Sequence, residues 1–368
     1  MIALILAAGF GTRCRPLTND KPKSLLSLGK DTVIDEQLRW LFAREDIDKV
    51  VIVSNQKFFD VFIKWQKQNP YREKIEILND GVSKEENRLG AIGDLVFAIE
   101  KIGLEDDLLV LGSDNLFDDN LDGMIDNFNK GKNITVAIHN FKKSLASVQP
   151  NEVRLDDDGF IIHYKEKPPK PATDNFVSLL YIFPKEFLPK ISEYLAEGNK
   201  SDNAGGLIEW LVKKNYKIRG FKMFGRRFDI GDIKSYLITQ KEKARPALFK
   251  EFFRVLKPNG KIVVSNVREG WKPFAIYLAH IRWSVKEKGI VKTIADIFRL
   301  LIPTLKIFYY NYLIQKENRN CVYSFIKPNE QQKLLQSAGF SGISENRLVY
   351  ANQAILNFGR KIQTSSKR

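Results

Sequence analysis

The sequence predicts an α/β protein in which a mixed β-sheet lies between two layers of helices, followed by a second unit of different character. Strand and helix signals alternate over residues 1–240, which is typical of a sheet whose strands are joined by helices. Charge separates the second unit: residues 241–368 contain 24 Lys and Arg against 8 Asp and Glu, whereas residues 1–240 are nearly neutral. We therefore expect two domains, 1–240 and 241–368, with the boundary in a charged stretch that ends at Pro246.

The first 240 residues hold the more regular alternation. Short apolar runs predict strands, and apolar residues spaced three and four apart predict helices. The expected strands are Ile2–Leu6, Lys49–Ser54, Lys74–Leu78, Asp107–Leu111, Ile134–His139, Glu152–Leu155, Phe160–Tyr164, Ser178–Phe183 and Lys217–Phe221. The expected helices are Asp35–Arg44, Phe58–Gln68, Leu89–Lys101, Asn203–Asn215 and Asp232–Gln240.

The last third predicts helices at Leu248–Leu256 and Asn329–Ala338, a strand at Lys261–Ser265, and a long basic and aromatic helical region at Gly270–Lys316. Apolar side chains recur in that region with roughly helical spacing, at Ile290, Ile294, Ile297, Phe298, Leu301, Leu305 and Phe308. We expect this stripe to face a core. Attraction of the same region to an anionic membrane surface is the alternative, and no nucleic-acid partner is expected.

Composition excludes several classes of protein. The two cysteines lie far apart in the sequence, so a disulfide framework is excluded, and three histidines make a zinc site improbable. A reducing, cytoplasmic location fits this composition. We interpret the apolar start of the chain as a buried strand entering a glycine loop rather than a signal peptide. No run of about 18 uncharged apolar residues follows, so we expect a soluble or peripheral protein.

A glycine loop directly after the first strand gives the strongest functional signal. It reads Gly9-x-Gly11-Thr12-Arg13, followed by Pro16, Thr18, Pro22 and Lys23. Glycines permit a tight turn whose backbone N–H groups converge on an anion. Arg13 can bind phosphate oxygens with two parallel hydrogen bonds, and Lys23 adds a flexible point charge. The loop lacks the third glycine of a dinucleotide-binding motif and the Gly-Lys-Ser/Thr of a P-loop.

The segment from Leu6 to Lys23 resembles the signature of the sugar-phosphate nucleotidylyltransferases, especially the glucose-1-phosphate thymidylyl- and uridylyltransferase-like group. The resemblance covers residues 1–240 and recurs in the family's order at Asn87-Arg88-Leu89-Gly90-Ala91, Gly112-Ser113-Asp114-Asn115, Glu166-Lys167-Pro168 and Phe228-Asp229-Ile230-Gly231. It implies a Rossmann-like three-layer domain. It also implies transfer of a nucleoside monophosphate from a nucleoside triphosphate to a sugar 1-phosphate, with release of pyrophosphate.

The resemblance implies a role for each matching residue. Asp114 and Asp229 would hold Mg²⁺, and with Arg13 and Lys23 they form the expected catalytic set. The sugar phosphate would contact Asn151, Glu166 and Lys167. The nucleotide would contact Leu6, Ala7, Ala8, Gly9, Gly11, Thr12, Arg13, Lys23 and Gly90. Elementary chemistry supports the scheme, because the attacking phosphate is already anionic and the main need is to neutralise the phosphates that meet.

Two positions depart from the family pattern on the acceptor side. Asn151 and Leu179 stand where the family usually has glycine. The nucleotide half therefore matches while the acceptor pocket is altered. The acceptor is then an unusual sugar phosphate or another phosphorylated alcohol such as phosphocholine. A non-catalytic nucleotide-binding scaffold is a further alternative.

The basic third has a resemblance of its own. Residues 248–264 and the turn Ser337-Ala338-Gly339-Phe340 are similar to the back half of a class I S-adenosylmethionine-dependent methyltransferase. The glycine loop and the acidic residue that bind the cofactor in that family are missing from residues 241–368. We interpret this part as an incomplete α/β methyltransferase-like segment. A methyltransferase completed by a partner chain stays open, as does a homo-oligomer.

Overall fold

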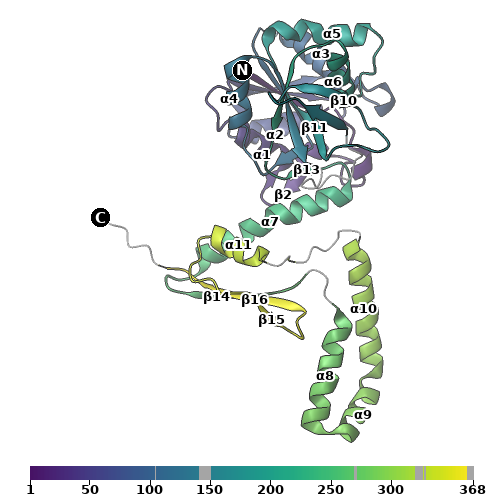
Figure 1. Cartoon of the computed structure of the whole chain (residues 1–368), viewed down its shortest axis with the longest axis vertical. Coiled ribbons are helices and arrows are strands. Elements are labelled where there is room, and N and C mark those ends of the chain that lie inside the picture. Colours follow the sequence, from purple (N-terminus) through teal and green to yellow (C-terminus); the bar gives the residue numbers. More distant parts are fainter. Residues whose placement is uncertain (104, 141–150, 269–271, 320–325, 327–328, 363–368) are drawn as a thin grey trace, which may run out of the picture. The chain divides into compact units, whose positions relative to one another are not determined.

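The computed structural model of the chain describes residues 1–103, 105–140, 151–268, 272–319, 326 and 329–362, without the side chains of 273, 301 and 314–319. Contacts divide the chain into two compact units, Met1–Tyr236 and Leu237–Arg368. Each unit has its own sheet (Figure 1).

A seven-stranded mixed sheet forms the centre of the first unit. Its strands, in spatial order, are β12 (Ile218–Lys222), β8 (Ile134–Asn140), β11 (Asn175–Phe183), β6 (Leu108–Gly112), β1 (Ile2–Leu6), β4 (Lys49–Ser54) and β5 (Ile75–Asn79). The strands β6, β1, β4 and β5 are parallel, and β11 is antiparallel to both of its neighbours. The carboxyl ends of the four parallel strands therefore meet at one edge, which is where an open α/β sheet binds its ligand.

Helices cover both faces of this sheet, because successive apolar side chains of a buried strand point to opposite sides. Leu4 of β1 joins one core, together with α3 (Gly90–Ile102), α5 (Leu188–Ala196) and α6 (Ala204–Lys213). Ile5 joins the other core, together with α1 (Val33–Leu41), α2 (Phe59–Gln68) and α4 (Asp122–Gly131). This arrangement confirms the predicted three-layer α/β fold. Helices α4 and α5 were not predicted from the sequence.

Three two-stranded sheets border the main sheet. They are β2 (Ser27–Leu28) with β3 (Asp31–Thr32), β7 (Asn115–Phe117) with β13 (Arg227–Asp229), and β9 (Glu152–Leu155) with β10 (Ile161–Lys165). The β7–β13 pair matters for the site, because its register sets Asp229 opposite Asn115. Two segments that are distant in sequence thus meet beside the end of β6.

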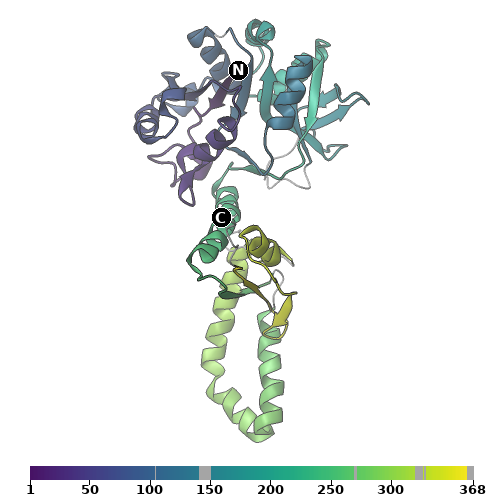
Figure 2. The same cartoon turned by 90° about the vertical axis from the view of Figure 1, so that its left-hand side faces the viewer.

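The second unit contains a small antiparallel sheet and a helical hairpin. The sheet runs β14 (Lys261–Val267), β16 (Ala354–Arg360) and β15 (Arg347–Val349), and packs with α11 (Glu330–Ser337) around Leu335 and Phe340. The hairpin consists of α8 (Pro273–Lys288), α9 (Ile290–Arg299) and α10 (Leu301–Arg319) (Figure 2). The interpretation of this unit as the back half of a methyltransferase stays a prediction.

The predicted helices Asp232–Gln240 and Leu248–Leu256 are parts of one helix, because α7 runs without interruption over Ile233–Val255. Proline removes one N–H and disturbs the turn before it, but the good helix formers on both sides of Pro246 keep the backbone helical. The boundary between domains at 240 stays a prediction. The expectation that the apolar stripe faces a core is wrong, since Ile290, Phe298 and Leu305 are 64%, 73% and 58% exposed. None of the described helices combines the length and apolar composition needed to cross a bilayer.

Candidate active site

The glycine loop leaves β1 at the carboxyl edge of the sheet. Gly11 has a φ of 64°, a left-handed conformation that glycine adopts without strain. The hydroxyl of Thr18 donates to the Gly11 carbonyl at 2.7 Å and closes the loop. A side chain at Gly9 would meet no atom within 4 Å, so the backbone there is open to a ligand. The predicted anion loop is therefore closed by its own residues and accessible.

Asp114 and Asp229 come together in the structure. Asp114 lies in the two-residue turn between β6 and β7, and the N–H of Ile230 donates to its carbonyl at 2.9 Å. Asp229 ends β13, where the pairing with β7 places it opposite Asn115. Both aspartates border the same cavity. The two carboxylates expected to hold a metal thus lie side by side, although they are far apart in the sequence.

Cations balance this carboxylate pair. Lys23 Nζ lies 2.5 Å from Asp114 Oδ2. Burial alone would raise the pKa of Asp114, but the nearby Lys23 and Arg227 cations outweigh it and hold that pKa below its ordinary value. Burial and the Asp114 charge raise the pKa of Asp229. The two carboxylates therefore differ, because the pKa of Asp114 is lowered and that of Asp229 is raised.

A short hydrogen-bond chain connects the aspartates to Arg227, which the sequence analysis missed. Asn115 Nδ2 donates to Asp114 Oδ1 at 2.9 Å, and Arg227 Nε donates to Asn115 Oδ1 at 2.7 Å. Arg227 Nη2 also lies 3.5 Å from Asp229 Oδ2, and its side chain is 11% exposed. The sequence could have indicated Arg227 by its position two residues before Asp229, because residues two apart in a strand point to the same face.

The first of two cavities at this edge measures about 230 Å³ and is bordered by most residues predicted to bind the nucleotide. These are Leu6, Ala7, Ala8, Gly9, Lys23 and Gly90, together with Asp114. Gly90 has a φ of 82°, and a Cβ there would come within 2.6 Å of the Asp202 backbone. Thr12 lies outside the lining and donates its hydroxyl to Glu85 at 3.0 Å. Gly11 lies outside it as well.

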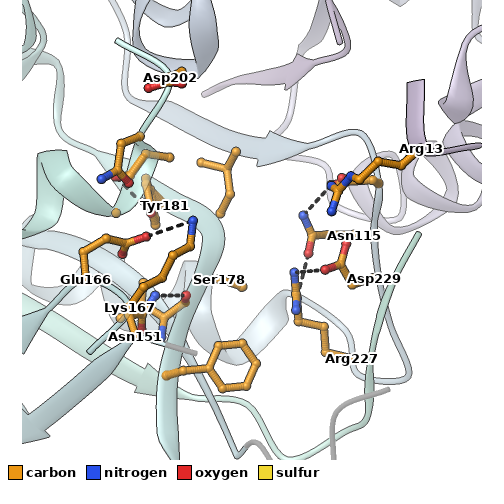
Figure 3. Close-up of a pocket in the computed structure, with 17 residues that line it drawn as sticks. Arg13, Asn115, Asn151, Glu166, Lys167, Ser178, Tyr181, Asp202, Arg227 and Asp229 are labelled. Atoms are coloured by element: carbon orange, nitrogen blue, oxygen red, sulfur yellow. Dashed lines mark hydrogen bonds and ion pairs between the residues drawn. The ribbon is translucent and has the colours of Figure 1, made fainter. Parts of the chain in front are cut away.

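The second cavity measures about 250 Å³ and holds the residues predicted to bind a sugar phosphate. Figure 3 shows Glu166, Lys167 and Asn151 on one side and Arg13 and Arg227 on the other. Arg13, predicted for the nucleotide, therefore borders this second cavity. The chain brings cations to both sides of a polar pocket, which suits an anionic ligand.

Contacts set the orientation of the side chains in the second cavity. Tyr164 donates its hydroxyl to Glu166 Oε2 at 2.7 Å, and Lys167 Nζ lies 3.5 Å from Glu166 Oε1. Asn151 accepts from the Val177 N–H at 2.7 Å and donates to the Val177 carbonyl at 2.9 Å. Its amide is thus anchored to β11, and its role in binding stays a prediction.

Leu179 stands between the two cavities and borders both of them. The lining residues Asp114 and Asp202 are also common to both. The cavities are therefore neighbouring halves of one site, with an apolar side chain between them where the family usually has glycine.

Sequence comparisons agree with this geometry. Over residues 2–245 the chain matches the profile of the family described as nucleotidyl transferase. It is 27% identical over 250 residues to the bifunctional protein GlmU of Methanocaldococcus jannaschii, which covers 65% of this chain and 55% of that protein. It is 29% identical over 191 residues to mannose-1-phosphate guanylyltransferase catalytic subunit beta of Dictyostelium discoideum, covering 52% of each. The chain spans about half the length of the curated relatives it matches.

Solved structures share the fold. A crystal structure of UDP-glucose pyrophosphorylase complexed with UDP-glucose matches with a TM-score of 0.55 and 19% identity, covering 66% of this chain and 98% of the other. At that identity the likeness concerns the fold alone. The profile match, in contrast, covers the glycine loop and both Asp114 and Asp229, and it confirms the family inferred from the motifs. On this evidence the chain belongs to the nucleotidyl transferase family.

Proposed function

We propose that the first unit transfers a nucleoside monophosphate from a nucleoside triphosphate to a sugar 1-phosphate and releases pyrophosphate. The observation that carries the proposal is the meeting of two cavities at Asp114 and Leu179. One is bordered by the glycine loop and Lys23, the other by Glu166 and Lys167. The name of one relative, a mannose-1-phosphate guanylyltransferase, supports the same class of reaction.

The reaction requires neutralisation of the negative charges of the two phosphate groups more than it requires proton transfer. An oxygen of the acceptor phosphate forms a bond to the α-phosphorus of the nucleotide, and the bond from that phosphorus to the bridging oxygen of pyrophosphate breaks. The attacking oxygen is already anionic, so no general base is required. Lys23 would bind the triphosphate, while Arg13 and Lys167 would hold the acceptor phosphate. Bringing both anions into one site supplies much of the rate enhancement.

The carboxylate pair fits a magnesium ion. Mg²⁺ is commonly held by one or two carboxylates, with waters and phosphate oxygens completing its coordination. Asp114 and Asp229 provide two adjacent carboxylates, and burial, followed by the Asp114 charge, raises the pKa of Asp229 despite the nearby cations. When bound there, the ion would neutralise charge on the reacting phosphates. Among the described residues, no group of three or more His, Cys, Asp and Glu could hold a metal ion.

A second acceptor class has support from the lining of the second cavity. Leu179 and Phe176 give it apolar surface, while Glu166 and Asp202 add carboxylates. These features suit a phosphorylated alcohol that carries a cationic group, such as phosphocholine. Sugar 1-phosphates remain the first proposal because the name of that relative points to them.

A pyrophosphate-release screen tests the proposal. The common nucleoside triphosphates would be paired with sugar 1-phosphates and with phosphocholine, with Mg²⁺ present. We expect turnover with one acceptor class and its loss in Asp114→Asn. Asp60→Asn, a change at an exposed carboxylate on α2, is the matched control and should keep full activity.

Other outcomes would support the competing interpretations. Nucleotide binding without pyrophosphate release on any acceptor would favour a non-catalytic scaffold. Binding of S-adenosylmethionine by the full chain would favour the methyltransferase alternative. A cytoplasmic location and a homo-oligomer also stay predictions, to be checked by fractionation of cells and by light scattering.

A further inference from the structure

A pair of carboxyl groups borders the nucleotide cavity and has no part in the scheme above. Asp80 follows β5 at the same sheet edge as the glycine loop. Asp94 lies on α3, one helical turn after Gly90, so both face the cavity. The first ten residues of α3 are otherwise Gly, Ala and larger apolar residues.

Asp94 has an unmet need for a hydrogen-bond partner. Its side chain is 7% exposed, and its Oδ1 has no partner among the described residues. Its carboxyl shares a hydrogen bond with Asp80, which also accepts from the Val82 N–H at 2.7 Å. Burial, followed by the Asp80 charge, raises the pKa of Asp94 to about 7. A buried polar atom without a partner is costly, and at the wall of a cavity the natural partner is the ligand.

The chemistry of the cavity suggests that the two carboxyl groups contact the base of the nucleotide rather than its phosphates. The glycine loop and Lys23 supply the groups that suit phosphates, whereas the Asp80 charge beside Asp94 repels phosphates. Hydrogen-bond acceptors in the same cavity suit donors on a base. Cytosine, adenine and guanine carry an exocyclic amino group, whereas uracil and thymine present carbonyl oxygens around one N–H.

We propose that Asp80 and Asp94 read the nucleobase and select triphosphates whose base carries an exocyclic amino group over UTP and dTTP. This inference rests on the proposed function, since it assigns the base of the same nucleotide. It departs from the thymidylyl- and uridylyltransferases that the sequence motifs resemble. The free Asp94 oxygen would accept from the amino group, whereas the O4 carbonyl of uracil or thymine would face carboxyl oxygens.

Direct binding of ATP, CTP, GTP, UTP and dTTP to the full chain by calorimetry, with Mg²⁺ present, tests the proposal. We expect at least one amino-bearing nucleotide to bind about tenfold more tightly than UTP and dTTP. In Asp94→Asn the amide can donate to O4, so the preference should shrink or reverse. Asp60→Asn should keep it. A thermal melt of each variant checks folding.

The outcomes separate this inference from the proposed function. Binding of UTP or dTTP as tight as that of every amino-bearing nucleotide would overturn the base selection and leave nucleotidyl transfer intact. An unchanged preference in a folded Asp94→Asn variant would do the same. Failure of every nucleotide to bind would overturn the proposed function as well. If Asp94→Asn does not fold, the wild-type affinities and Asp80→Asn still decide.

A second observation, independent of the nucleotide site, concerns the helical hairpin. Helices α8 and α10 run side by side (Figure 2), and Phe308 of α10 lies 6.0 Å from Phe274 and 5.6 Å from Tyr277 of α8, between ring centroids. Ser284 and Thr293 hydrogen-bond at 3.1 Å near the turn at Gly289. These contacts hold the three helices of the hairpin together.

The outside of this hairpin is both apolar and basic. Large apolar side chains are widely exposed along it, among them Trp283 at 52%, Val291 at 83%, Phe298 at 73% and Ile302 at 68%. Exposed apolar side chains in such number along one hairpin are typical of an interaction site. The residues of α8–α10 include eight Lys and Arg against three Asp and Glu. A second copy of the hairpin would bring the same charge, whereas anionic lipid complements both properties.

We infer that the α8–α10 hairpin docks the protein onto an anionic phospholipid surface without crossing it. The test is flotation of the full chain with vesicles of phosphatidylcholine alone or with about one third phosphatidylglycerol, a fraction that gives a strongly negative surface. We expect binding to the anionic vesicles only, weakened by salt. The double change Val291→Glu and Phe298→Glu should abolish it. The matched control is Phe224→Glu, a 76% exposed side chain of the first unit.

Two results would overturn this inference. One is equal binding to both vesicle types, or none to either. The other is a lipid-free dimer, seen by light scattering, that Val291→Glu and Phe298→Glu convert to a monomer, because a second copy of the chain would then be the occupant of the surface.

Discussion

Lys23 and Asp114 form an ion pair at the wall of the first cavity, with Nζ 2.5 Å from Oδ2. The contact joins the end of the glycine loop to the end of the central strand β6. It explains why Asp114 can stay ionised although it is partly buried, since the Lys23 and Arg227 charges outweigh the burial that would raise its pKa. A group predicted to bind phosphate thus also controls the charge of a predicted metal ligand.

The first prediction follows from this contact. Lys23→Ala should raise KM for the nucleotide by roughly 10- to 100-fold, the loss expected for one charge-assisted hydrogen bond. It should also move the acidic limb of the pH–rate profile to higher pH. The reason is that burial of Asp114 is then opposed by one cation fewer, so its pKa rises.

Steady-state kinetics between about pH 5 and 9, the range in which shifted carboxyl groups titrate, would check both effects. Lys23→Arg keeps the charge and is the control, and its acidic limb should stay near the wild-type position. An acidic limb unmoved in Lys23→Ala would show that Asp114 does not depend on Lys23.

The second prediction concerns Arg227, which borders the acceptor cavity. Its guanidinium is held by Asn115 and Asp229, and it lies 5.5 Å from the centre of the Phe176 ring. Arg227→Gln should raise KM for the acceptor phosphate about tenfold, because a charge-assisted bond to that phosphate is lost. The Kd of the nucleotide, measured by calorimetry, should stay unchanged.

A neighbouring arginine provides the control for this change. Arg226 pairs with Asp118 at 2.7 Å and is 48% exposed, outside both cavities. Arg226→Gln should therefore leave both constants near their wild-type values. Equal effects of the two substitutions would mean that Arg227 acts through the stability of β13 and not through the acceptor.

The sequence predicted those parts of the molecule that are determined by residues close together in the chain. Short apolar runs located the strands β1, β4 and β6, and the spacing of the glycines located the anion loop. It could not locate Arg227 or Asp94 as site residues. Their roles depend on β7 pairing with β13, and on α3 facing a cavity at the end of β5, and these relations join distant segments.

The errors have equally specific causes. A proline after a charged stretch is a reasonable stop signal, yet α7 continues through Pro246 because the surrounding residues favour helix. The apolar stripe of α9 has the period of a core-facing helix, and period alone does not tell whether a core, a membrane or another chain covers that face.

The third prediction concerns stability and the buried carboxyl of Asp94. Its pKa is raised to about 7 by burial and by Asp80. The unfolded value is about 3.9. Between these pH values the folded protein keeps a proton that the unfolded chain releases, so Asp94 makes the free energy of unfolding fall as pH rises. Asn cannot titrate, so Asp94→Asn should remove this dependence.

Denaturant unfolding at pH 5 and pH 8 would measure the effect. The stability of Asp94→Asn relative to wild type should increase from pH 5 to pH 8, by up to a few kcal/mol. Asp80, Arg88, Lys23, Asp114 and Asp202 also border this cavity, so the comparison is made between variants at each pH. Asp60→Asn should show no such trend. A constant difference between Asp94→Asn and wild type would place the Asp94 pKa near its ordinary value.

The fourth prediction separates the two units. Residues 1–245 should keep pyrophosphate release, because all residues of both cavities lie before residue 232. The cut falls within α7, but the start of this helix is anchored to the first unit by Tyr236, whose hydroxyl donates to the Ser27 carbonyl at 2.8 Å. The same fragment should lose vesicle binding, since it lacks α8–α10.

Tyr236→Phe in the fragment tests the anchor and should lower its thermal stability, with a cost of about 1 kcal/mol for one hydrogen bond. A fragment that stays folded by circular dichroism yet loses catalysis would show that the basic unit contributes to the active site. The second cavity would then be the place to look, because the cations Arg13, Lys167 and Arg227 border it.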